Sequence, residues 1–580
     1  MIPPAPSTRA VSNSGENSEG WAPSGVGALG WDTAVVVLLV GGFLAWTTLP
    51  GLHWHDTGEF AAVAWRLSVA HSPGHPLHAL TTRAIQEIPL GDGIFRANLA
   101  SALAITLALA GLHGLLRRVV PSAPRWAALA AAVTPAVMPA IWLQGVRAEV
   151  YGLQLLLAVL CAHLAWSVAT GDRRALPALG LAFGLAGANH HLIGVSLVPM
   201  AVLALLRARP GLRGWLWGAA GGVVGLGTYA LLPLRARAGA EVGWGMPVDL
   251  PRLVDTVLAR EWVGADPAGN QPIDLIENTQ KIAAWTMEQV GLPAAMLLFL
   301  GLAVGLLGAW RRARPALVGA AAAVVGVAAT KFVTALDEFN PDQGGYLAPM
   351  LCALVVLGFV CLAHLPRVGV RGTWAWGAVL LLAAPGFDSG GRQGARAADA
   401  YGRAMLAEVP PDGALGAGDY ATWFLAWGLR AVEGARPDAA LVFQGRAGAD
   451  WLWERLALQR PDLAVARSAW PEGPPWSAIT VFEPGPRGAP SGMLALSEAE
   501  DFEGIAGAHP DLDTRRFVAL QHLNRALVLG SRGAVAAARA HLAAARVLVG
   551  DDPELAAAER RLAPASENLR GPLDARQGGW

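Results

Sequence analysis

The chain has 580 residues, of which 54% are hydrophobic and only 15% are charged, whereas soluble domains carry about 25% charged residues. Its mean hydropathy is +0.40 and its formal net charge is +0. This composition favours a polytopic membrane protein and provides no overall charge that would attract nucleic acid. The three cysteines, Cys161, Cys352 and Cys361, lie in apolar segments and follow no disulfide or zinc pattern.

Residues 1–30 are rich in Ser, Gly, Pro and Asn, which predicts a disordered cytoplasmic tail. About eleven apolar segments follow, each near the length of about 20 residues that a membrane-spanning helix needs. The segment 175–206 is either two short helices broken at Asn189 or one long tilted helix. The predicted spans are 33–50, 97–116, 126–143, 150–169, 175–188, 191–206, 215–233, 291–309, 316–334, 346–364 and 372–386.

Arginines collect in every second short loop between these segments, and this bias predicts the orientation, because cytoplasmic loops carry excess Lys and Arg. The N-terminus is therefore expected in the cytoplasm, and the C-terminal third outside, most simply in the periplasm of a bacterium with the chain in its inner membrane. The arginine-rich loops hold Arg117, Arg118 and Arg125; Arg173 and Arg174; Arg207, Arg209 and Arg213; Arg311, Arg312 and Arg314; and Arg367 and Arg371.

The predicted fold class is mainly α: a transmembrane domain over 31–386 with a C-terminal extramembrane part. Two long outer loops, 51–96 and 234–290, contain helical patterns at Phe60–Leu67 and Leu253–Val263. Residues 387–400 are expected to be a linker. The stretch 401–510 predicts a small α/β region with a strand at 413–419, a helix at 420–434 and a strand at 439–444. The Ala-rich pattern within 511–580 predicts a tetratricopeptide-like helical region.

Two polar groups follow the first apolar segment. Asp56, preceded by His55, lies three residues before Glu59, so a helix would place both carboxylates on one face, where one can act as a general base. The alternative is an acidic first turn that the helix dipole favours. His71 and His75 flank a Pro-Gly turn, which indicates either a phosphate or metal contact or only a rigid turn.

The remaining candidates interrupt apolar segments or lie at their outer ends, where polar groups usually face a cavity or a partner. Arginines in such places can bind phosphate, although interfacial anchors and structural ion pairs have the same composition. The acidic loop 337–346 can hold a hard cation, but its spacing matches no EF-hand. The candidates are Arg147, Glu149, Tyr151, Asn189, His190, His191, Arg235, Arg237, Trp244, Asn340 and Asp342.

Several of these runs, in this order, resemble the motifs of a polytopic family of protein O-mannosyltransferases that includes transmembrane protein 260. The resemblance covers roughly residues 30 to 365. Thr57 and His75 stand where the family usually has Ser and Tyr. The matching runs are Asp56–Phe60, Ala70–Leu77, Phe95–Leu99 with Arg96, Glu149–Tyr151, Asn189–His191, Leu232–Arg235 with Trp244 and Gly245, and Asn340–Asp342.

The resemblance implies a GT-C glycosyltransferase fold of about 11 transmembrane helices. Such an enzyme takes a sugar, mannose by family, from a polyprenyl-phosphate donor on the outer face and transfers it with inversion to a hydroxyl, here of a protein Ser or Thr. It implies that Asp56 is the base, with Glu59 beside it. Binding of the substrates would fall to His55, His71, His75, Arg96 and the candidates above. The lipid-linked sugar is a co-substrate, and no resident cofactor or metal is expected, although a divalent ion is not excluded.

Two other functions fit a polytopic chain. A transporter or flippase of lipid-linked sugars would carry charges near the membrane midplane and internal repeats, whereas here the charges cluster in the outer loops. A structural anchor that presents the C-terminal part to a partner would not need the polar loop residues. The transferase is the favoured interpretation because the charges lie in the outer loops. Fold analogy alone does not fix function.

Overall fold

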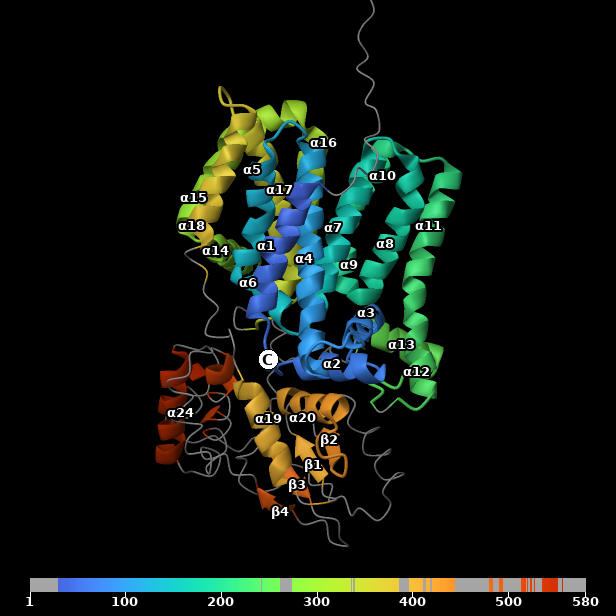
Figure 1. Ribbon diagram of the computed structural model, residues 1–580, viewed down its shortest axis with the longest axis vertical. Helices are drawn as coiled ribbons and strands as arrows, with labels where there is room; N and C mark the ends of the chain where they lie inside the picture. The colour runs from blue at the N-terminus through green and yellow to red at the C-terminus, as the bar shows by residue number, and fades with distance from the viewer. Residues whose placement is uncertain are drawn as a thin grey trace, which may run out of the picture.

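The computed structural model describes residues 30–240, 242–260, 274–334, 340–384, 396–409, 414–417, 420–443, 479–482, 490–493, 513–517 and 535–550, with single residues between and beyond them. A bundle of long helices forms one half of the molecule, and a small α/β unit lies against one end of it (Figure 1). The bundle helices are α1 Trp31–Thr47, α4 Gly93–Val119, α5 Arg125–Val133, α6 Pro139–Val146, α7 Val150–Ala169, α8 Leu176–Asn189, α9 His191–Ser196, α10 Val198–Ala208, α11 Leu212–Leu226, α12 Leu231–Arg237, α15 Leu292–Arg312, α16 Arg314–Thr334, α17 Gln343–Ala363 and α18 Ala375–Ala383.

Seven helices of the described chain are long and apolar enough to cross a membrane, or eight if the bent pair at 125–146 counts as one span. That pair breaks by 72° where Pro135 and Pro139 interrupt the helix. The apolar helices Trp31–Thr47 and Val370–Ala383 are shorter. Each of the eleven predicted segments coincides with a helix, a bent pair or a consecutive pair of helices, and 175–206 holds α8, α9 and the start of α10, with a break after Asn189.

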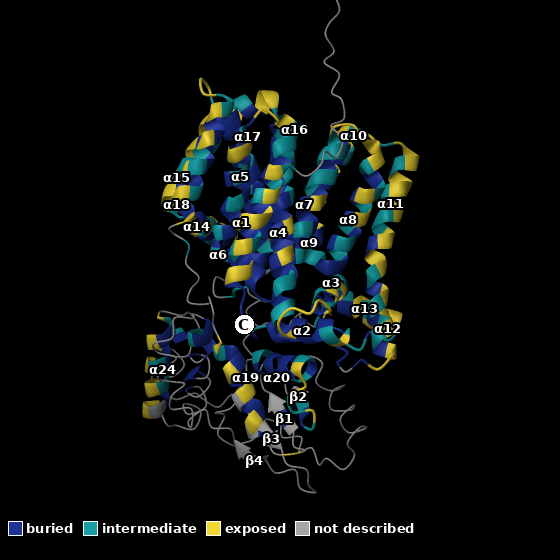
Figure 2. Ribbon diagram, in the orientation of Figure 1, coloured by how far each residue is buried: buried dark blue, intermediate teal, exposed yellow. Residues whose placement is uncertain are grey.

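The bundle has one apolar core and an apolar outer surface. The core runs between α1, α4, α5, α7 and α17, and α17 is almost completely buried. Outward-facing side chains on the peripheral helices are large and apolar, such as Phe299 at 73% exposure and Val223 at 69%, as Figure 2 shows for α11 and α15. An apolar surface of this extent indicates contact with lipid.

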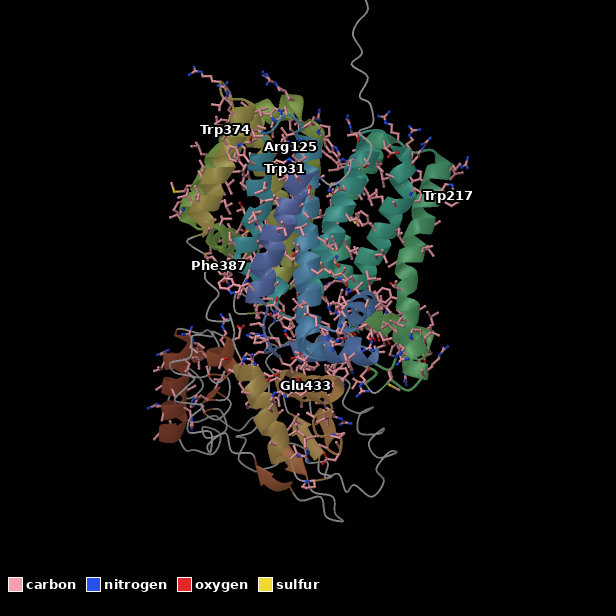
Figure 3. The ribbon with its side chains drawn as sticks, in the orientation of Figure 1. Trp31, Arg125, Trp217, Trp374, Phe387 and Glu433 are labelled. Atoms are coloured by element: carbon pink, nitrogen blue, oxygen red, sulfur yellow. The ribbon has the colours of Figure 1, made fainter. Side chains whose placement is uncertain are left out.

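The two ends of the bundle differ. The arginine-rich loops join the helices at the end where Trp31, Arg125 and Trp374 lie (Figure 3); we call this the arginine-rich end. The two long loops lie at the opposite end, which we call the carboxylate end (Figure 1). The long loops fold into α2 Thr57–Arg66, α3 Pro76–Gln86, α13 Leu250–Val257 and α14 Leu275–Val290, near the predicted helical patterns.

The C-terminal α/β unit packs on the carboxylate end. It contains α19 Ala397–Glu408, β1 Ala414–Ala417, α20 Tyr420–Glu433, β2 Ala440–Phe443, β3 Ile479–Phe482 and β4 Pro490–Met493, in the sheet order β2-β1-β3-β4. β1 and β2 are parallel and α20 connects them, as the sequence predicts, while β3 and β4 pair antiparallel. Helix α20 lies along α2, and together they form a second apolar core with Trp54, Trp244 and Phe424.

The last described helix is α24 Val535–Val549. A short helical segment around Asp513–Phe517 contacts the first long loop, where the Trp54 indole donates to Thr514 Oγ1 at 3.0 Å and stacks on Phe517 at 4.2 Å. Most of the predicted tetratricopeptide-like region lies outside the described residues, as do Asp337–Phe339. Of the predicted linker 387–400, most also lies outside them, but its end is not a linker, because α19 begins at Ala397.

Candidate active site

Three loops that are far apart in sequence meet at the carboxylate end of the bundle. They precede α2, α7 and α17, and they bring Asp56, Glu149 and Asp342 together, so that one oxygen of each lies within 4.8 Å of the others. Each residue stands at a helix start because a polar residue next to an apolar run ends the spanning segment at the membrane surface. The polar runs that contain Asp56, Glu149 and Asp342 are therefore brought together in the structure.

Asp56 immediately precedes α2, but its carboxylate accepts no capping hydrogen bond from that helix. An acidic first turn that serves the helix alone would use such a bond. The Asp56 side chain is 25% exposed, so it reaches solvent while the residues around it are buried. Desolvation raises the pKa of Asp56 to about 7, with His71 opposing the rise and Asp342 and Glu59 adding to it.

His71 links the two carboxylates of α2. Its backbone N–H donates to Glu59 Oε1 at 2.8 Å, and its Nδ1 contacts Glu59 Oε2. The other ring nitrogen, Nε2, lies 3.8 Å from Asp56 Oδ2. Glu59 is completely buried and positions the ring, because a carboxylate on one imidazole nitrogen sets the orientation of the other. Asp56, Glu59 and His71 thus form one connected unit.

Arg147 is completely buried among the other carboxylates. Its Nη2 contacts Asp342 Oδ1, and its Nη1 lies 3.5 Å from Glu149 Oε1. Burial alone would lower the pKa of Arg147, but Glu149 and Asp342 raise it, so the guanidinium is permanently charged. Desolvation raises the pKa of Glu149 well above its ordinary value, although Arg147 opposes the rise. Within the part of the chain that the structure describes, neither Glu149 carboxylate oxygen has a hydrogen-bond partner.

An aromatic wall borders the carboxylates. His190 lies 4.9 Å from Tyr346 and 5.8 Å from Tyr151, measured between ring centroids, and His75 lies 5.6 Å from His190. Asn189 is buried and donates to Val150 O and Gln154 Oε1 at 3.1 and 3.0 Å, while its carbonyl contacts His75 Nδ1 at 2.6 Å. The break between α8 and α9 therefore fixes His75 and His190 beside the site.

Some predicted residues lie at the border of the site. His55, with a positive φ of 65°, turns the chain into Asp56, and burial lowers its pKa. Trp244 lies 6.5 Å from His71 and packs on Phe424. The His191 ring stacks 6.1 Å from His190. Asn340 Oδ1 accepts from the Asp342 N–H at 2.9 Å and so holds the start of α17 in place.

Arg235 and Arg237, expected to bind phosphate, and Arg96, assigned to substrate binding by the family resemblance, have other contacts. Arg235 donates to the carbonyls of Leu67 and Arg66, at the end of α2, at 2.7 and 3.1 Å. Arg237 donates to Val248 O at 2.6 Å, and Arg96 to Ile88 O and Asp92 O. Free carbonyls at helix ends accept from such side chains, so these arginines hold the loops instead of lining the carboxylate cluster.

Sequence reasoning missed one cation. Lys331 of α16 is completely buried; its Nζ contacts Gln343 Oε1 and lies 4.3 Å above the Tyr346 ring. The available signal was a lysine inside an apolar segment, in a chain whose only other lysine is Lys281, because a charge at membrane depth usually faces a site.

Asn98 of α4 was also missed as a structural residue. Its amide donates to Leu49 O and Gly51 O at 2.8 and 3.0 Å and accepts from the Ala148 N–H at 2.8 Å. One buried side chain therefore ties the Asp56 loop to the Glu149 loop.

Two sets of ligand atoms are spaced closely enough for a metal ion. They are Asp56, Glu59 and His71, and Asp56, Glu149 and Asp342, with Asp56 common to both. In the structure the Arg147 guanidinium contacts Asp342 of the second set, and within the first set the His71 imidazole contacts Glu59. The arrangement can take a proton from a hydroxyl at Asp56 and can stabilise a negative leaving group with Arg147 and Lys331.

The fold resembles that of ArnT from Cupriavidus metallidurans bound to undecaprenyl phosphate. The TM-score is 0.51 at 16% sequence identity, over 74% of this chain and 88% of that chain. The apo structure of the same protein has the same identity and coverage with a TM-score of 0.42. The similarity of the first structure defines the fold class: the chain is a polytopic membrane protein with the GT-C architecture.

Residues 56–212 match the family described as Protein O-mannosyl-transferase TMEM260 N-terminal domain. The matched segment begins at Asp56 and includes Glu59, His71, Arg147 and Glu149. Over this segment the chain is similar to membrane glycosyltransferases of the O-mannosyltransferase type. No curated protein sequence matches the chain.

Proposed function

We propose that this enzyme moves a mannosyl group from a polyprenyl-phosphate carrier to a Ser or Thr hydroxyl of an acceptor protein. The family of residues 56–212 supports the sugar and the acceptor. The undecaprenyl phosphate that ArnT binds supports the carrier, and a bundle surrounded by lipid offers such a carrier direct access to the site. The reaction takes place at the carboxylate end, which we assign to the periplasmic side of a bacterial inner membrane.

The observation that carries this proposal is the position of Asp56, which is partly exposed beside buried Glu149 and Arg147. Asp56 takes the proton of the acceptor hydroxyl while the hydroxyl oxygen attacks the anomeric carbon. The bond from that carbon to the phosphate oxygen breaks, and its electron pair leaves with the phosphate. Attack on the face opposite the leaving group inverts the anomeric centre.

The leaving phosphate needs positive charge, and Arg147 and Lys331 supply it from buried positions, where electrostatic stabilisation is strongest. Glu59 and His71 keep Asp56 oriented. Because the Arg147 guanidinium pairs with both Glu149 and Asp342, we propose that the reaction proceeds without a resident metal or other cofactor.

The test is Asp56→Asn in the full chain, assayed with a panel of polyprenyl-phosphate sugars and an acceptor peptide that contains Ser and Thr. The amide keeps the shape but cannot accept the proton, and loss of a general base typically costs about 10²–10⁴ in rate. Glu87→Gln is the matched control, because the Glu87 side chain is 64% exposed and pairs only with Arg83. Transfer by the Asn variant at the rate of the control would remove Asp56 from this role.

A further inference from the structure

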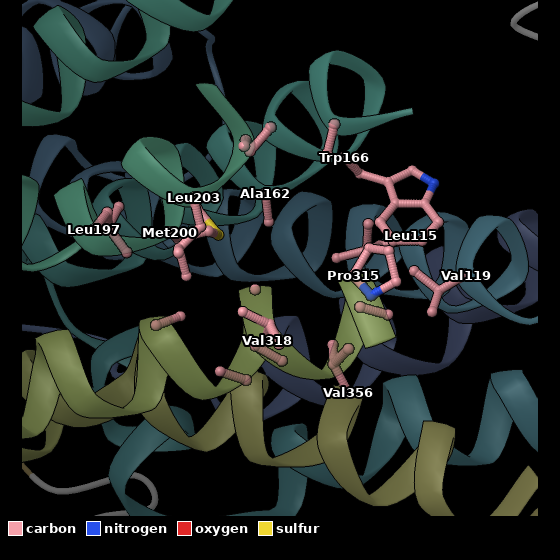
Figure 4. Close-up of a pocket in the computed structure, with 18 of the residues that line it drawn as sticks. Leu115, Val119, Ala162, Trp166, Leu197, Met200, Leu203, Pro315, Val318 and Val356 are labelled. Atoms are coloured by element: carbon pink, nitrogen blue, oxygen red, sulfur yellow. The ribbon is translucent and has the colours of Figure 1, made fainter. Parts of the chain in front are cut away.

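A cavity of about 770 Å³ lies inside the bundle, between α7 and α10 on one side and α16 and α17 on the other (Figure 4). Its walls are apolar, with Leu197, Met200 and Leu203 facing Val318 and Val356. The volume is within the range of about 300–1,000 Å³ that small-molecule sites occupy. None of the residues of the carboxylate cluster lines this cavity.

The cavity is as deep as one leaflet of a bilayer. Along α7 its lining extends from Leu155 to Ala169, which at a rise of about 1.5 Å per residue corresponds to about 21 Å. Half of a bilayer that is about 40–45 Å thick with its headgroup regions is about 20–22 Å. A lipid entering from the arginine-rich end would therefore contact the cavity wall over most of its length.

Five exposed arginines line the rim of the cavity at the arginine-rich end: Arg207, Arg209, Arg311, Arg312 and Arg314. Arg207 donates to Ala169 O at 2.9 Å, and Arg314 lies over the Trp310 ring at 4.6 Å. Within the described parts of the chain, none of the five forms an ion pair with a carboxylate. The bias of cytoplasmic loops toward Lys and Arg explains why these loops contain arginines. It does not explain why five arginines without acidic partners surround the opening of an apolar cavity.

We propose that this cavity binds an anionic phospholipid of the adjoining leaflet, with an acyl chain between α10 and α16 and the phosphate at the arginine rim. Charge complementarity selects an anionic headgroup, and the depth of the cavity fits one leaflet and not the much longer tail of a polyprenyl carrier. The site is separate from the carboxylates, so the proposal does not rest on the proposed transferase reaction.

The experiment is native mass spectrometry of the full chain, titrated with phosphatidylglycerol, with phosphatidylcholine of the same acyl chains, and with undecaprenyl phosphate. We expect phosphatidylglycerol to bind at least about tenfold more tightly than phosphatidylcholine. Each basic residue at headgroup level contributes about 1 kcal/mol, so Arg311→Gln with Arg312→Gln should weaken phosphatidylglycerol binding by about thirtyfold.

The matched control is Arg367→Gln with Arg371→Gln, which removes the same charge at the same end but outside the cavity and should change the affinity by less than about threefold. Ala320→Phe fills the cavity from α16 without a change of charge and should abolish binding. Three results would each overturn the proposal. They are equal affinity for the two phospholipids, an equal loss of phosphatidylglycerol affinity in the two double arginine variants, and displacement of phosphatidylglycerol by undecaprenyl phosphate.

Discussion

At the scale of single residues, the proposed reaction depends on the protonation state of Asp56. Its pKa is raised to about 7, so the carboxylate form that accepts a proton is depleted below that pH and populated above it. We expect kcat/KM to rise about tenfold per pH unit below about 7 and to level off above it. The measurement is the pH profile of sugar transfer from about pH 5.5 to about 8.5, and a flat profile there would contradict the assignment.

Arg147 is the residue whose loss should damage the fold most. It is completely buried between Asp342 and Glu149, and removal of one partner from a buried ion pair costs about 3–5 kcal/mol, because the remaining charge stays desolvated. We expect Arg147→Gln to lower the Tm by several degrees, and a second change, Asp342→Asn, to recover part of the loss.

The three buried cysteines provide the measurement for that prediction, since a maleimide dye reaches them only as the chain unfolds. Equal melting curves for the native chain and Arg147→Gln would show that the guanidinium is not needed for stability. A double variant less stable than the single variant would show that Asp342 does not depend on Arg147.

A second test at this scale concerns metal. The Arg147 guanidinium already pairs with Glu149 and Asp342, and the His71 imidazole contacts Glu59, so we expect transfer to survive prolonged treatment with EDTA. The assay compares treated protein with protein to which Mg²⁺ or Mn²⁺ is returned. Activity that disappears with EDTA and returns with one of these ions would place a cation on Asp56, which is common to both sets of potential ligands.

The sequence predicted which acidic residues lie together better than it predicted the contacts of the arginines and of Lys331. Asp56, Glu149 and Asp342 were predicted because a carboxylate beside an apolar segment is costly unless it has a partner. Arg235 was predicted to bind phosphate, but its guanidinium donates to carbonyls at the end of α2. That partner depends on how two loops fold against each other, which periodicity does not determine.

At the scale of elements, the position of α2 depends on α20. The two helices cross at Gly58 and Gly428, where a Cβ on Gly428 would lie 2.9 Å from the Cα of Gly58. So close an approach is possible only without side chains. The helix that carries Glu59 and follows Asp56 is therefore held in place by the C-terminal α/β unit.

We expect Gly428→Ala to push α2 and α20 apart and to lower kcat by about 10- to 100-fold, since a shift of 1 Å at a catalytic group can cost about 10². Gly319→Ala on α16 is the control, because a Cβ there meets nothing within 4 Å. The assay of sugar transfer decides. Normal kcat in a folded Gly428→Ala chain would mean that α2 keeps its position without α20.

Hydropathy predicted the spanning helices and the β1-α20-β2 unit, because local pattern and length determine both. It did not predict that α20 would cover α2, nor the pairing of β3 and β4 with β1. Contacts between segments several hundred residues apart leave no periodic signal in either segment. The glycines at the crossing were visible in the sequence, but nothing there indicated that they meet.

At the scale of the whole molecule, the remaining prediction is the orientation of the bundle in the membrane. The arginine-rich loops gather at one end and the carboxylates at the other, and the excess of arginine predicts that its end faces the cytoplasm. The native cysteines are all buried, so a single introduced cysteine gives a clean label. Glu87→Cys marks the carboxylate end and Arg312→Cys the arginine-rich end.

Intact cells treated with a membrane-impermeant maleimide should label Glu87→Cys and leave Arg312→Cys unlabelled until the membrane is permeabilised, while the unsubstituted chain should stay unlabelled throughout. The opposite pattern would place Asp56 in the cytoplasm. A carrier whose sugar faces the periplasm would then be out of reach of Asp56, so the proposed reaction would have to start from a donor on the cytoplasmic side. Orientation is therefore the property on which the identity of the donor depends.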